Sequence, residues 1–190
     1  IRNISEKFYS TKFFKYMPPT VLTKDINKIK IFYKKYRKIV IKPIHGYAGK
    51  GILFLNNTFK KKEILKLLRN NGHAMVQKFL PNVKKGDKRV FIINGKVCGA
   101  IRRIPSKNSI LSNISQGGTA VKTTLNSKQN KISSIIAKDL LKNKIYFAGI
   151  DFVSNYLIGD INVTSPTGLP QYKELTGINL GETFWDSLEN

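Results

Sequence analysis

The sequence predicts an α+β fold in which helices cover antiparallel sheets. Residues 85–105 and 148–163 each pair two strand-like runs around a short turn, which is the pattern of a β-hairpin. Residues 25–36, 59–70 and 126–143 repeat apolar side chains with the period of an amphipathic helix. Because a hairpin joins antiparallel strands, the sheets built on these segments are predicted to be antiparallel.

The chain is long enough for one domain and is strongly basic. Its 190 residues can bury a core and suit a single domain, with room for a mobile subdomain. Thirty-four Lys and Arg against 11 Asp and Glu give a formal charge of +23, which raises nucleic-acid binding as an alternative. Lys is spread through nearly every segment, together with abundant Ile and Asn. We therefore attribute the charge to compositional bias and expect no nucleic-acid partner.

The single Cys98 and the absence of a long apolar run bear on the compartment. One cysteine excludes an internal disulfide framework and is typical of a reducing compartment. No apolar run approaches the roughly 20 residues that span a bilayer. We expect a soluble, cytoplasmic protein with no membrane partner.

The first helix is predicted at residues 5–16. Ser5 can cap its N-terminus, and Phe8, Phe13 and Phe14 supply its apolar side. The sequence MPPT that follows ends the helix.

A second helix and a buried strand follow. Ile26, Ile29 and Phe32 lie on one side of the helix at residues 25–36. The apolar run at 38–43 is typical of a parallel or otherwise buried strand.

A glycine-rich loop follows Lys42, the last basic residue of that strand. Gly46, Gly49 and Gly51 alternate with other residues before a second apolar run. Without a Cβ, such a loop lets backbone N–H groups approach phosphates closely. It is not a P-loop, because the Gly-Lys-Ser/Thr ending is missing. A plain hairpin turn is the alternative.

The hairpin at residues 85–105 has the clearest turn in the chain. Asn94-Gly95 is the favoured type I′ pair. Arg89 and Arg103 lie near the two open ends, so across an antiparallel pair they can point into one site. An arginine there can hold a phosphoryl group with two hydrogen bonds.

For the remaining segments the residue pattern predicts secondary structure but, by itself, no chemical role. A Lys-rich helix at 59–70 precedes an apolar strand at 73–80, and the polar stretch 106–118 has the composition of a mobile lid. The helix at 126–143 should bury Ile132, Ile135, Ile136 and Leu140. A closing helix at 181–188 should pack through Phe184 and Trp185.

The hairpin near the C-terminus carries most of the functional information. Its strands are predicted at 148–153 and 156–163, and Ser154-Asn155 forms a two-residue turn between them.

Two carboxylates and an amide should share one face of that hairpin. A simple two-residue loop places Asp151 opposite Ile158, and Asp160 and Asn162 follow on the same face. Oxygen ligands of this kind suit Mg²⁺. The alternative is that these are ordinary polar residues on the wet face of the sheet.

Short motifs along the whole chain resemble those of bacterial glutathione synthetases, which are ATP-grasp ligases. In the family's order they are SEK at 5–7, IKP at 41–43, GDKRV at 86–90, RIP at 103–105, GGT at 117–119 and INVTSPTG at 161–168. The resemblance implies an ATP-grasp fold that clamps a nucleotide between two subdomains. Residues from about 40 to 100 would form the smaller clamp, and those from about 101 to 190 the metal- and substrate-binding part.

The resemblance also implies roles for individual residues. The catalytic arginines would be Arg89 and Arg103, and the metal ligands Asp151, Asp160 and Asn162. The nucleotide would be held by Lys7, Lys42, Gly46, Gly49 and Gly51, by the hinge residues Gln77, Lys78, Phe79 and Leu80, and by Asn113 in the lid.

The implied reaction is the ATP-dependent ligation of γ-glutamylcysteine with glycine through an acyl phosphate, giving glutathione, ADP and phosphate. The cofactors would be ATP and Mg²⁺, with Mn²⁺ as a substitute, and the full-length enzyme a homo-oligomer. In this family an upstream substrate-binding domain precedes such a region, and we expect that it is absent from the chain that begins at Ile1.

The chain departs from the family pattern at two positions. Asp160 stands where Glu is usual and follows one extra residue, which a β-bulge could absorb, and Leu111 replaces an Arg of the lid. Another ATP-grasp carboxylate–amine ligase and an inactive ATP-grasp remnant therefore remain alternatives, with a basic nucleic-acid-binding module as a remote one.

Overall fold

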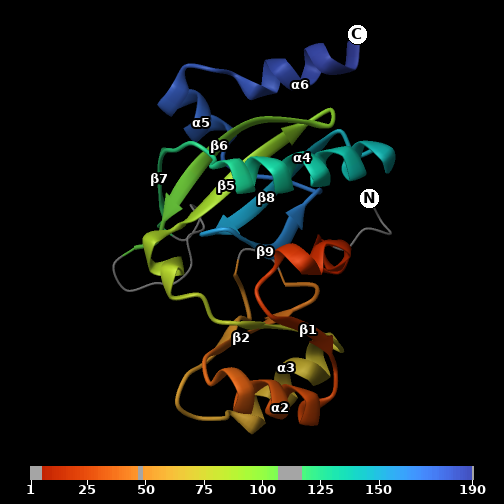
Figure 1. The fold of residues 1–190 in the computed structure, drawn as a ribbon, viewed down its shortest axis with the longest axis vertical. Coiled ribbons are helices and arrows are strands. Elements are labelled where there is room, and N and C mark those ends of the chain that lie inside the picture. The colour runs from red at the N-terminus through yellow and green to blue at the C-terminus, as the bar shows by residue number, and fades with distance from the viewer. Residues whose placement is uncertain (1–5, 47–48, 107–116, 190) are drawn as a thin grey trace.

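Two antiparallel sheets and their covering helices make up the fold (Figure 1). The computed structural model describes residues 6–46, 49–106 and 117–189. The smaller sheet has the strand order β1-β4-β2-β3, and the larger has the order β7-β6-β5-β8-β9. The predicted α+β class with antiparallel sheets is confirmed.

The elements follow the chain in a simple order. The first part contains α1 (Glu6–Tyr9), the 3₁₀ helix η1 (Ser10–Tyr16), β1 (Thr20–Thr23), α2 (Ile26–Tyr36), β2 (Ile39–Pro43), β3 (Leu53–Leu55), α3 (Lys61–Asn71), β4 (Ala74–Lys78) and the 3₁₀ helix η2 (Pro81–Lys85). The second part contains β5 (Asp87–Ile93), β6 (Lys96–Ile104), β7 (Thr119–Lys122), α4 (Ser127–Lys142), β8 (Phe147–Val153), β9 (Tyr156–Asn162), α5 (Leu169–Thr176) and α6 (Leu180–Glu189).

The small sheet is covered by α2 and α3. Asp25 caps α2 by accepting a hydrogen bond from Asn27 N, so the helix begins where the sequence predicts. Ile29 of α2 and Ile64 of α3 are fully buried against Ile41 of β2. β2 is buried as predicted, and it pairs antiparallel with β3 and β4.

The large sheet is covered on both faces. One core joins Ile132 and Ile136 of α4 to strands β5, β8 and β9, and the other joins α5 and α6 to β5 and β6 through Phe91 and Tyr172. Figure 1 shows α4 in front of this sheet and α5 and α6 above it. No helix among residues 6–46, 49–106 and 117–189 is long and apolar enough to cross a bilayer.

The N-terminal helix differs from its prediction. Tyr9 and Phe13 are buried, whereas Phe8 is 59% and Phe14 41% exposed. The reason is that the α-helix gives way to a 3₁₀ helix at Ser10, and the tighter turn changes which side chains share a face. The segment packs against β9 and ties the two sheets together, because its core also contains Met75 of β4.

Two other side chains are more exposed than predicted. Ile135 points away from the core on α4 and is 37% exposed, and Trp185 on α6 is 64% exposed. Phe184 packs against the core as predicted. Four short elements, β1, η2, β7 and α5, were not predicted.

The chain passes from the small sheet to the large sheet between β4 and β5. The small sheet ends with β4 at Lys78 and the large sheet begins with β5 at Asp87. A division near residue 100 falls inside β6, which pairs along its length with β5. Both strands of this hairpin therefore belong to the large sheet.

Candidate functional site

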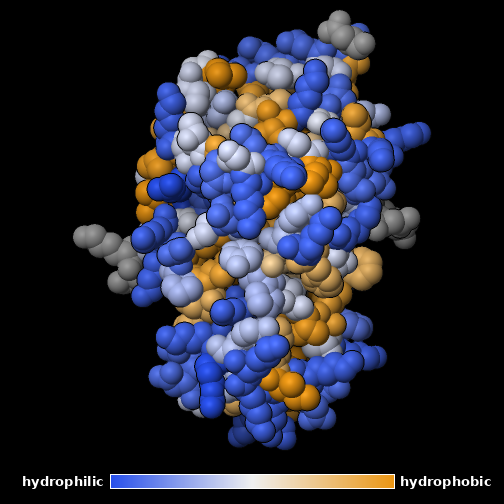
Figure 2. Space-filling view, in the orientation of Figure 1, coloured by the Kyte–Doolittle hydropathy of each residue, from blue (hydrophilic) through white to orange (hydrophobic). Residues whose placement is uncertain are grey.

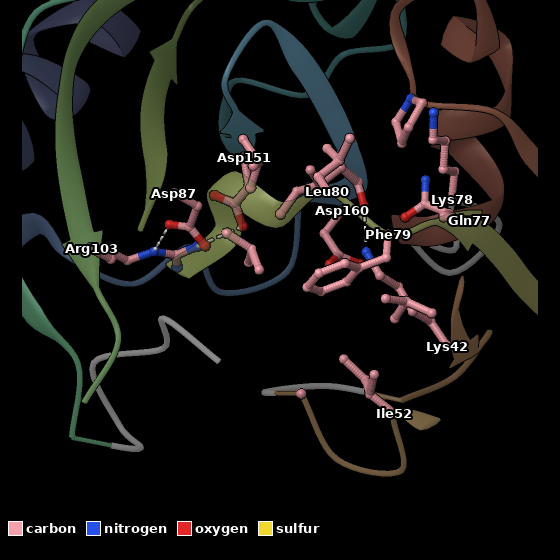
Figure 3. A pocket seen from close by; sticks show the side chains of 16 residues that line it. Lys42, Ile52, Gln77, Lys78, Phe79, Leu80, Asp87, Arg103, Asp151 and Asp160 are labelled. Atoms are coloured by element: carbon pink, nitrogen blue, oxygen red, sulfur yellow. Dashed lines mark hydrogen bonds and ion pairs between the residues drawn. The ribbon is translucent and has the colours of Figure 1, made fainter. Parts of the chain in front are cut away.

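A cavity of about 120 Å³ lies between the two sheets (Figure 3). The small sheet lines it through β2 and β4, and the large sheet through β5, β6, β8 and β9. Nine of the residues predicted from the sequence line the cavity: Lys42, Gly49, Gln77, Lys78, Phe79, Leu80, Arg103, Asp151 and Asp160.

The connection that leaves β4 forms one wall of the cavity. Gln77, Lys78, Phe79 and Leu80 all line it. Phe79 packs against Phe54 of β3, with ring centroids 4.6 Å apart. The N–H groups of Lys78 and Phe79 already donate at 2.9 Å to the carbonyls of Pro19 and Lys38, the residues just before β1 and β2. A ligand that contacts this wall would therefore meet a backbone held in place on both sides.

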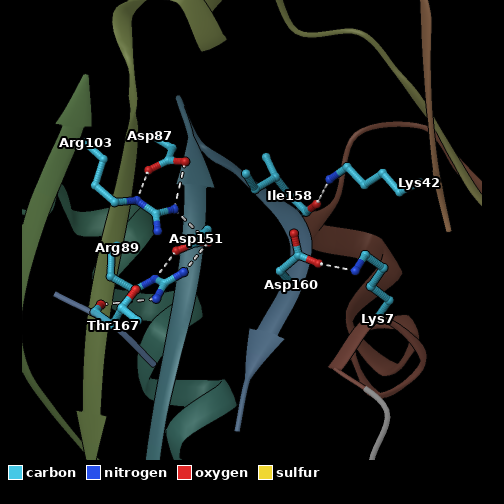
Figure 4. A network of polar contacts seen from close by, with 9 residues as sticks. All are labelled: Lys7, Lys42, Asp87, Arg89, Arg103, Asp151, Ile158, Asp160 and Thr167. Carbon is cyan, nitrogen blue, oxygen red and sulfur yellow. Dashed lines mark hydrogen bonds and ion pairs between the residues drawn. The ribbon is translucent and has the colours of Figure 1, made fainter. Parts of the chain in front are cut away.

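Two buried lysines reach from the N-terminal half of the chain to β9 (Figure 4). Lys42 Nζ donates to the Ile158 carbonyl at 2.5 Å. Lys7 Nζ donates to the Gly46 carbonyl and lies 3.4 Å from Asp160 Oδ1. Burial lowers the pKa of Lys42, and the Asp160 charge opposes that shift.

Arginines and carboxylates form a buried chain on the large sheet (Figure 4). Arg103 binds Asp87 with two hydrogen bonds, at 2.7 and 2.8 Å, and its Nη2 lies 2.9 Å from Asp151 Oδ2. Arg89 also binds Asp151 with two hydrogen bonds and donates through Nη1 to the Thr167 carbonyl at 3.3 Å. Asp151 is therefore shared by both predicted catalytic arginines.

The two arginines do not occupy equivalent places. Arg103 lines the cavity, whereas Arg89 lies behind Asp151 and outside the lining. Both are 2% exposed. Both arginines contact Asp151, but of the two only Arg103 lines the cavity.

The surroundings of Asp87 and Asp151 shift the pKa of each carboxyl group. Burial raises the pKa of Asp151, but the charges of Arg103 and Arg89 outweigh it and lower that pKa to about 2. Burial and the neighbouring Asp151 charge raise the pKa of Asp87 above its ordinary value. Asp151 is thus the carboxylate that the arginines hold ionised most firmly.

The β8–β9 hairpin contains the predicted turn and an irregular register. Val153 pairs with Tyr156, which confirms the two-residue turn. Beyond it, Ile158, Gly159 and Asp160 together stand opposite the single residue Asp151. Asp151 therefore does not pair with Ile158 alone, and the bulge suggested by the longer strand is present.

This bulge brings Asp151 and Asp160 to the same cavity. Asn162 keeps the same face, opposite Gly149, but lies outside the cavity lining. Asp160 Oδ1 is buried and accepts no hydrogen bond in the described part of the chain. Lys7 Nζ, 3.4 Å away, is its ion-pair neighbour, and a hard cation would supply the close contact that this oxygen lacks.

The residues present fit a divalent cation held chiefly by carboxylates. Asp160 supplies Oδ1, which accepts no hydrogen bond among the described residues, and Asp151 lines the same cavity with both oxygens already accepting from arginines. Within the described ranges, no three His, Cys, Asp or Glu side chains cluster as metal ligands. Such a site suits Mg²⁺, which commonly takes one or two carboxylates together with substrate phosphates.

The glycine loop joins β2 to β3 beside the cavity. Gly49 lines the cavity and has a φ of 76°, a conformation that favours glycine. Gly46 has no room for a side chain, because a Cβ there would lie 2.5 Å from Pro43 Cγ. Gly51 follows with a φ of 73° and leads into β3. The predicted strand–loop–strand arrangement is confirmed.

Sequence reasoning missed Asp87 and could not place Asn113. Asp87 lines the cavity and holds Arg103, and its position opposite Arg103 in the hairpin was the available signal. Asn113 lies outside the described residues, as does Leu111.

Comparisons with known proteins agree with this architecture. The family model for the ATP-grasp domain of prokaryotic glutathione synthetase matches residues 6–177. The glutathione synthetase of Synechocystis sp. is 38% identical over 185 residues, which cover 96% of this chain and 58% of that protein. The glutathione synthetase of Mesorhizobium japonicum is 36% identical over 194 residues, covering 100% of this chain and 61% of that protein.

Solved structures share the fold at low sequence identity. The ATP-grasp ligase PsnB, complexed with a minimal precursor, has a TM-score of 0.71 at 15% identity, covering 98% of this chain and 60% of that one. The D-alanine–D-alanine ligase from Bacillus anthracis, complexed with ATP, has a TM-score of 0.62 at 15% identity, covering 96% and 63%. The predicted ATP-grasp fold is confirmed, and the family match over most of the chain shows that it belongs to the ATP-grasp domain family of prokaryotic glutathione synthetases.

Proposed function

We propose that this chain is the ATP-binding part of a glutathione synthetase, which joins γ-glutamylcysteine to glycine at the expense of ATP. The observation that carries the proposal is the cavity in which Lys42, Arg103, Asp151 and Asp160 meet the hinge wall, in a chain that matches the family. Because the chain spans 58% and 61% of the two relatives above, the activity of the whole protein is part of the proposal.

The cavity divides into an apolar and a charged side. Val40, Ile52, Phe79 and Leu80 supply apolar surface from the small sheet and the hinge, where a nucleotide base would be shielded from water. Lys42, Lys78 and Arg103 supply positive charge, and the phosphates would lie toward them. The nucleotide would thus run from the hinge to the large sheet.

The first chemical step is transfer of the γ-phosphoryl group to the dipeptide carboxylate. A carboxylate oxygen attacks phosphorus, the bond to the bridging oxygen breaks, and ADP leaves with that electron pair. Arg103 is suited to the charge on the transferred group, because its two hydrogen bonds to Asp87 fix its orientation beforehand.

The second step forms the amide. The amine of glycine attacks the acyl carbonyl, phosphate leaves, and the amine loses a proton. The cavity walls would limit competing attack by water on the acyl phosphate. Arg89 would act indirectly. It donates hydrogen bonds to Asp151 and to the Thr167 carbonyl and does not line the cavity.

We propose Mg²⁺ as the cation and Asp160 and Asp151 as its protein ligands. When bound, a divalent cation neutralises phosphate charge during the transfer. Mn²⁺ shares the preference for oxygen ligands, so both metals belong in the test. The single Cys98 supports a reducing, cytoplasmic compartment.

ADP release with a panel of carboxylate and amine substrates tests the proposal. We expect release to require γ-glutamylcysteine, glycine and a divalent cation together, and glutathione to appear in equal amount. Faster release with D-alanine, or with another acceptor pair, would instead assign the chain to a different ATP-grasp carboxylate–amine ligase. ATP binding without release, even when the chain is tested within the full-length protein, would identify an inactive remnant.

A further inference from the structure

The positive charge of the chain is concentrated at one end of the molecule. Residues 20–85 contain 17 of the 34 Lys and Arg but only two of the 11 acidic residues, Asp25 and Glu63. Residues 86–190 contain 13 basic and eight acidic residues. A compositional bias alone would spread the excess evenly, so the small-sheet half carries a charge that needs its own explanation.

Most of this charge lies on one surface. The exposed Lys and Arg of residues 24–38 and 60–69 number twelve, and we call their surface the basic helical face. α2 and α3 contact each other and cover the same face of the small sheet, so these side chains lie on and beside two neighbouring helices. Figure 1 places it at the end opposite α6, and the surface around that end is mostly hydrophilic in Figure 2.

The two acidic residues within it do little to balance the charge. Asp25 is committed to capping α2, and Glu63 pairs only with Lys60, at 3.4 Å. Lys30 and Lys34, like Lys62 and Lys66, stand four residues apart on one helix, where like charges destabilise each other. Binding of an external polyanion would relieve this repulsion and would therefore be favourable.

The chemistry of the surface favours nucleic acid over an acidic protein. Protein interfaces are depleted in Lys and enriched in aromatic residues, whereas ten of these twelve side chains are Lys. Phosphate backbones are bound by such lysines without a fixed geometry. We propose that the basic helical face binds nucleic acid through its phosphates.

A groove beside α2 offers a second place for nucleic acid to bind. It has a volume of about 360 Å³, and Lys28, Lys35, Ile31 and Tyr36 are among its lining residues. Ile31 is 68% exposed, and Lys35 Nζ lies 5.4 Å from the centroid of the Tyr36 ring. Apolar surface between lysines suits an unpaired base whose flanking phosphates contact the ammonium groups.

An anionic bilayer fits this surface less well. An interfacial helix inserts a broad apolar face, but the apolar faces of α2 and α3 are buried in the small-sheet core. On α2 and α3, Ile31 is the exposed large apolar side chain. The basic helical face therefore presents positive charge but lacks the exposed apolar area that insertion into a bilayer needs.

Binding of the full chain to a fluorescent 20-nucleotide single strand and to a matched duplex tests the proposal. The helix α2 is about 16 Å long, so a nucleic acid lying along it would bring several phosphates within reach. If about four are neutralised, affinity should fall roughly 100-fold between 50 and 200 mM salt. Saturating ATP should leave the affinity unchanged, because the cavity lies on the other side of the small sheet from these helices.

Two variants that lose the same number of charges show whether binding depends on the basic helical face or only on the net charge of the chain. Neutralising Lys28, Lys30, Lys62 and Lys66 to Gln should weaken binding at least tenfold. The control neutralises the exposed Lys128, Lys131, Lys138 and Lys142 of α4 to Gln and should change affinity less than threefold. Circular dichroism confirms that both variants fold.

Three results would overturn the proposal. One is no saturable binding of either strand by the wild type at 50 mM salt. A second is equal weakening by both variants, which would make the interaction one of net charge. The third is displacement of the nucleic acid by polyglutamate or anionic vesicles at equal charge concentration, which would assign the face to a protein or membrane partner.

Discussion

The two sheets face the same cavity with different kinds of charge. The small sheet offers two lysines, each a single point charge: the buried Lys42, which donates one hydrogen bond to the Ile158 carbonyl, and the exposed Lys78. The large sheet offers Arg103 and Asp151, locked with Asp87 and Arg89 by paired hydrogen bonds. The difference indicates that the large sheet is organised before a ligand arrives, while the exposed Lys78 on the small-sheet side can adjust to it.

The largest effect should come from breaking the ion-pair chain at its centre. Asp151→Asn leaves two buried guanidinium groups without their shared carboxylate, and we expect the free energy of unfolding to fall by about 3–5 kcal/mol. Urea denaturation at pH 7 measures this. In the control Glu63→Gln, which removes an exposed pair, the loss should stay below about 1 kcal/mol. Similar losses in both would contradict a preorganised large sheet.

Exchanging the two arginines for lysine separates their roles. Arg103→Lys should lower the rate of ADP release about 100-fold, because Lys cannot reproduce the oriented fork that faces the cavity. Arg89→Lys should lower the rate less than tenfold, while its melting temperature falls. Steady-state kinetics and thermal unfolding measure both variants. Equal rate losses would mean that Arg89 also contacts the reacting groups.

The stability contributed by Asp151 should depend on pH in a known direction. Its pKa is lowered to about 2 in the folded chain, below the ordinary value of 3.8, so its contribution is present above about pH 4. It is lost as pH falls through 2, at about 2 kcal/mol in total. The difference in unfolding free energy between the wild type and Asp151→Asn should therefore shrink between pH 5 and pH 2. A constant difference would show that the pKa is not lowered.

The smallest effect should come from a lysine on the small-sheet side. Lys78→Met removes one exposed point charge from the cavity edge, and we expect affinity for an ATP analogue to fall about 3- to 10-fold. The free energy of unfolding should stay within about 0.5 kcal/mol of the wild type. Calorimetry and urea denaturation test the two expectations. A large loss of stability would place Lys78 among the preorganised groups.

Local chemistry explains what the sequence predicted well. Asn94 and Gly95 both have positive φ, as the type I′ turn requires, and Asp25 caps α2 through its own side chain. These features depend on residues within a few positions of each other. The hinge and the glycine loop were placed by their resemblance to family motifs, and both line the cavity.

What depended on pairing between distant strands was harder to predict. The pairing of Asp87 with Arg103 follows from the hairpin register, and the bulge opposite Asp151 changes which residues reach the cavity. The inward turn of Tyr9 depends on a switch from α to 3₁₀ geometry. Trp185 was expected in the core because of its apolar side chain, but burial is decided by the elements beside a helix rather than by its own pattern.

The most direct test of the account is calorimetry of ATP-analogue binding, with and without Mg²⁺, on the wild type and on Asp160→Ala. Asp160 Oδ1 accepts no hydrogen bond among the described residues, and its ion-pair neighbour Lys7 Nζ lies 3.4 Å away, so the account predicts saturable, Mg²⁺-dependent binding by the wild type. Asp160→Ala should lose the Mg²⁺ dependence and bind at least tenfold more weakly in its presence. No binding by a folded wild type, or equal Mg²⁺ dependence in both proteins, would contradict the assignment of this cavity as the nucleotide and metal site.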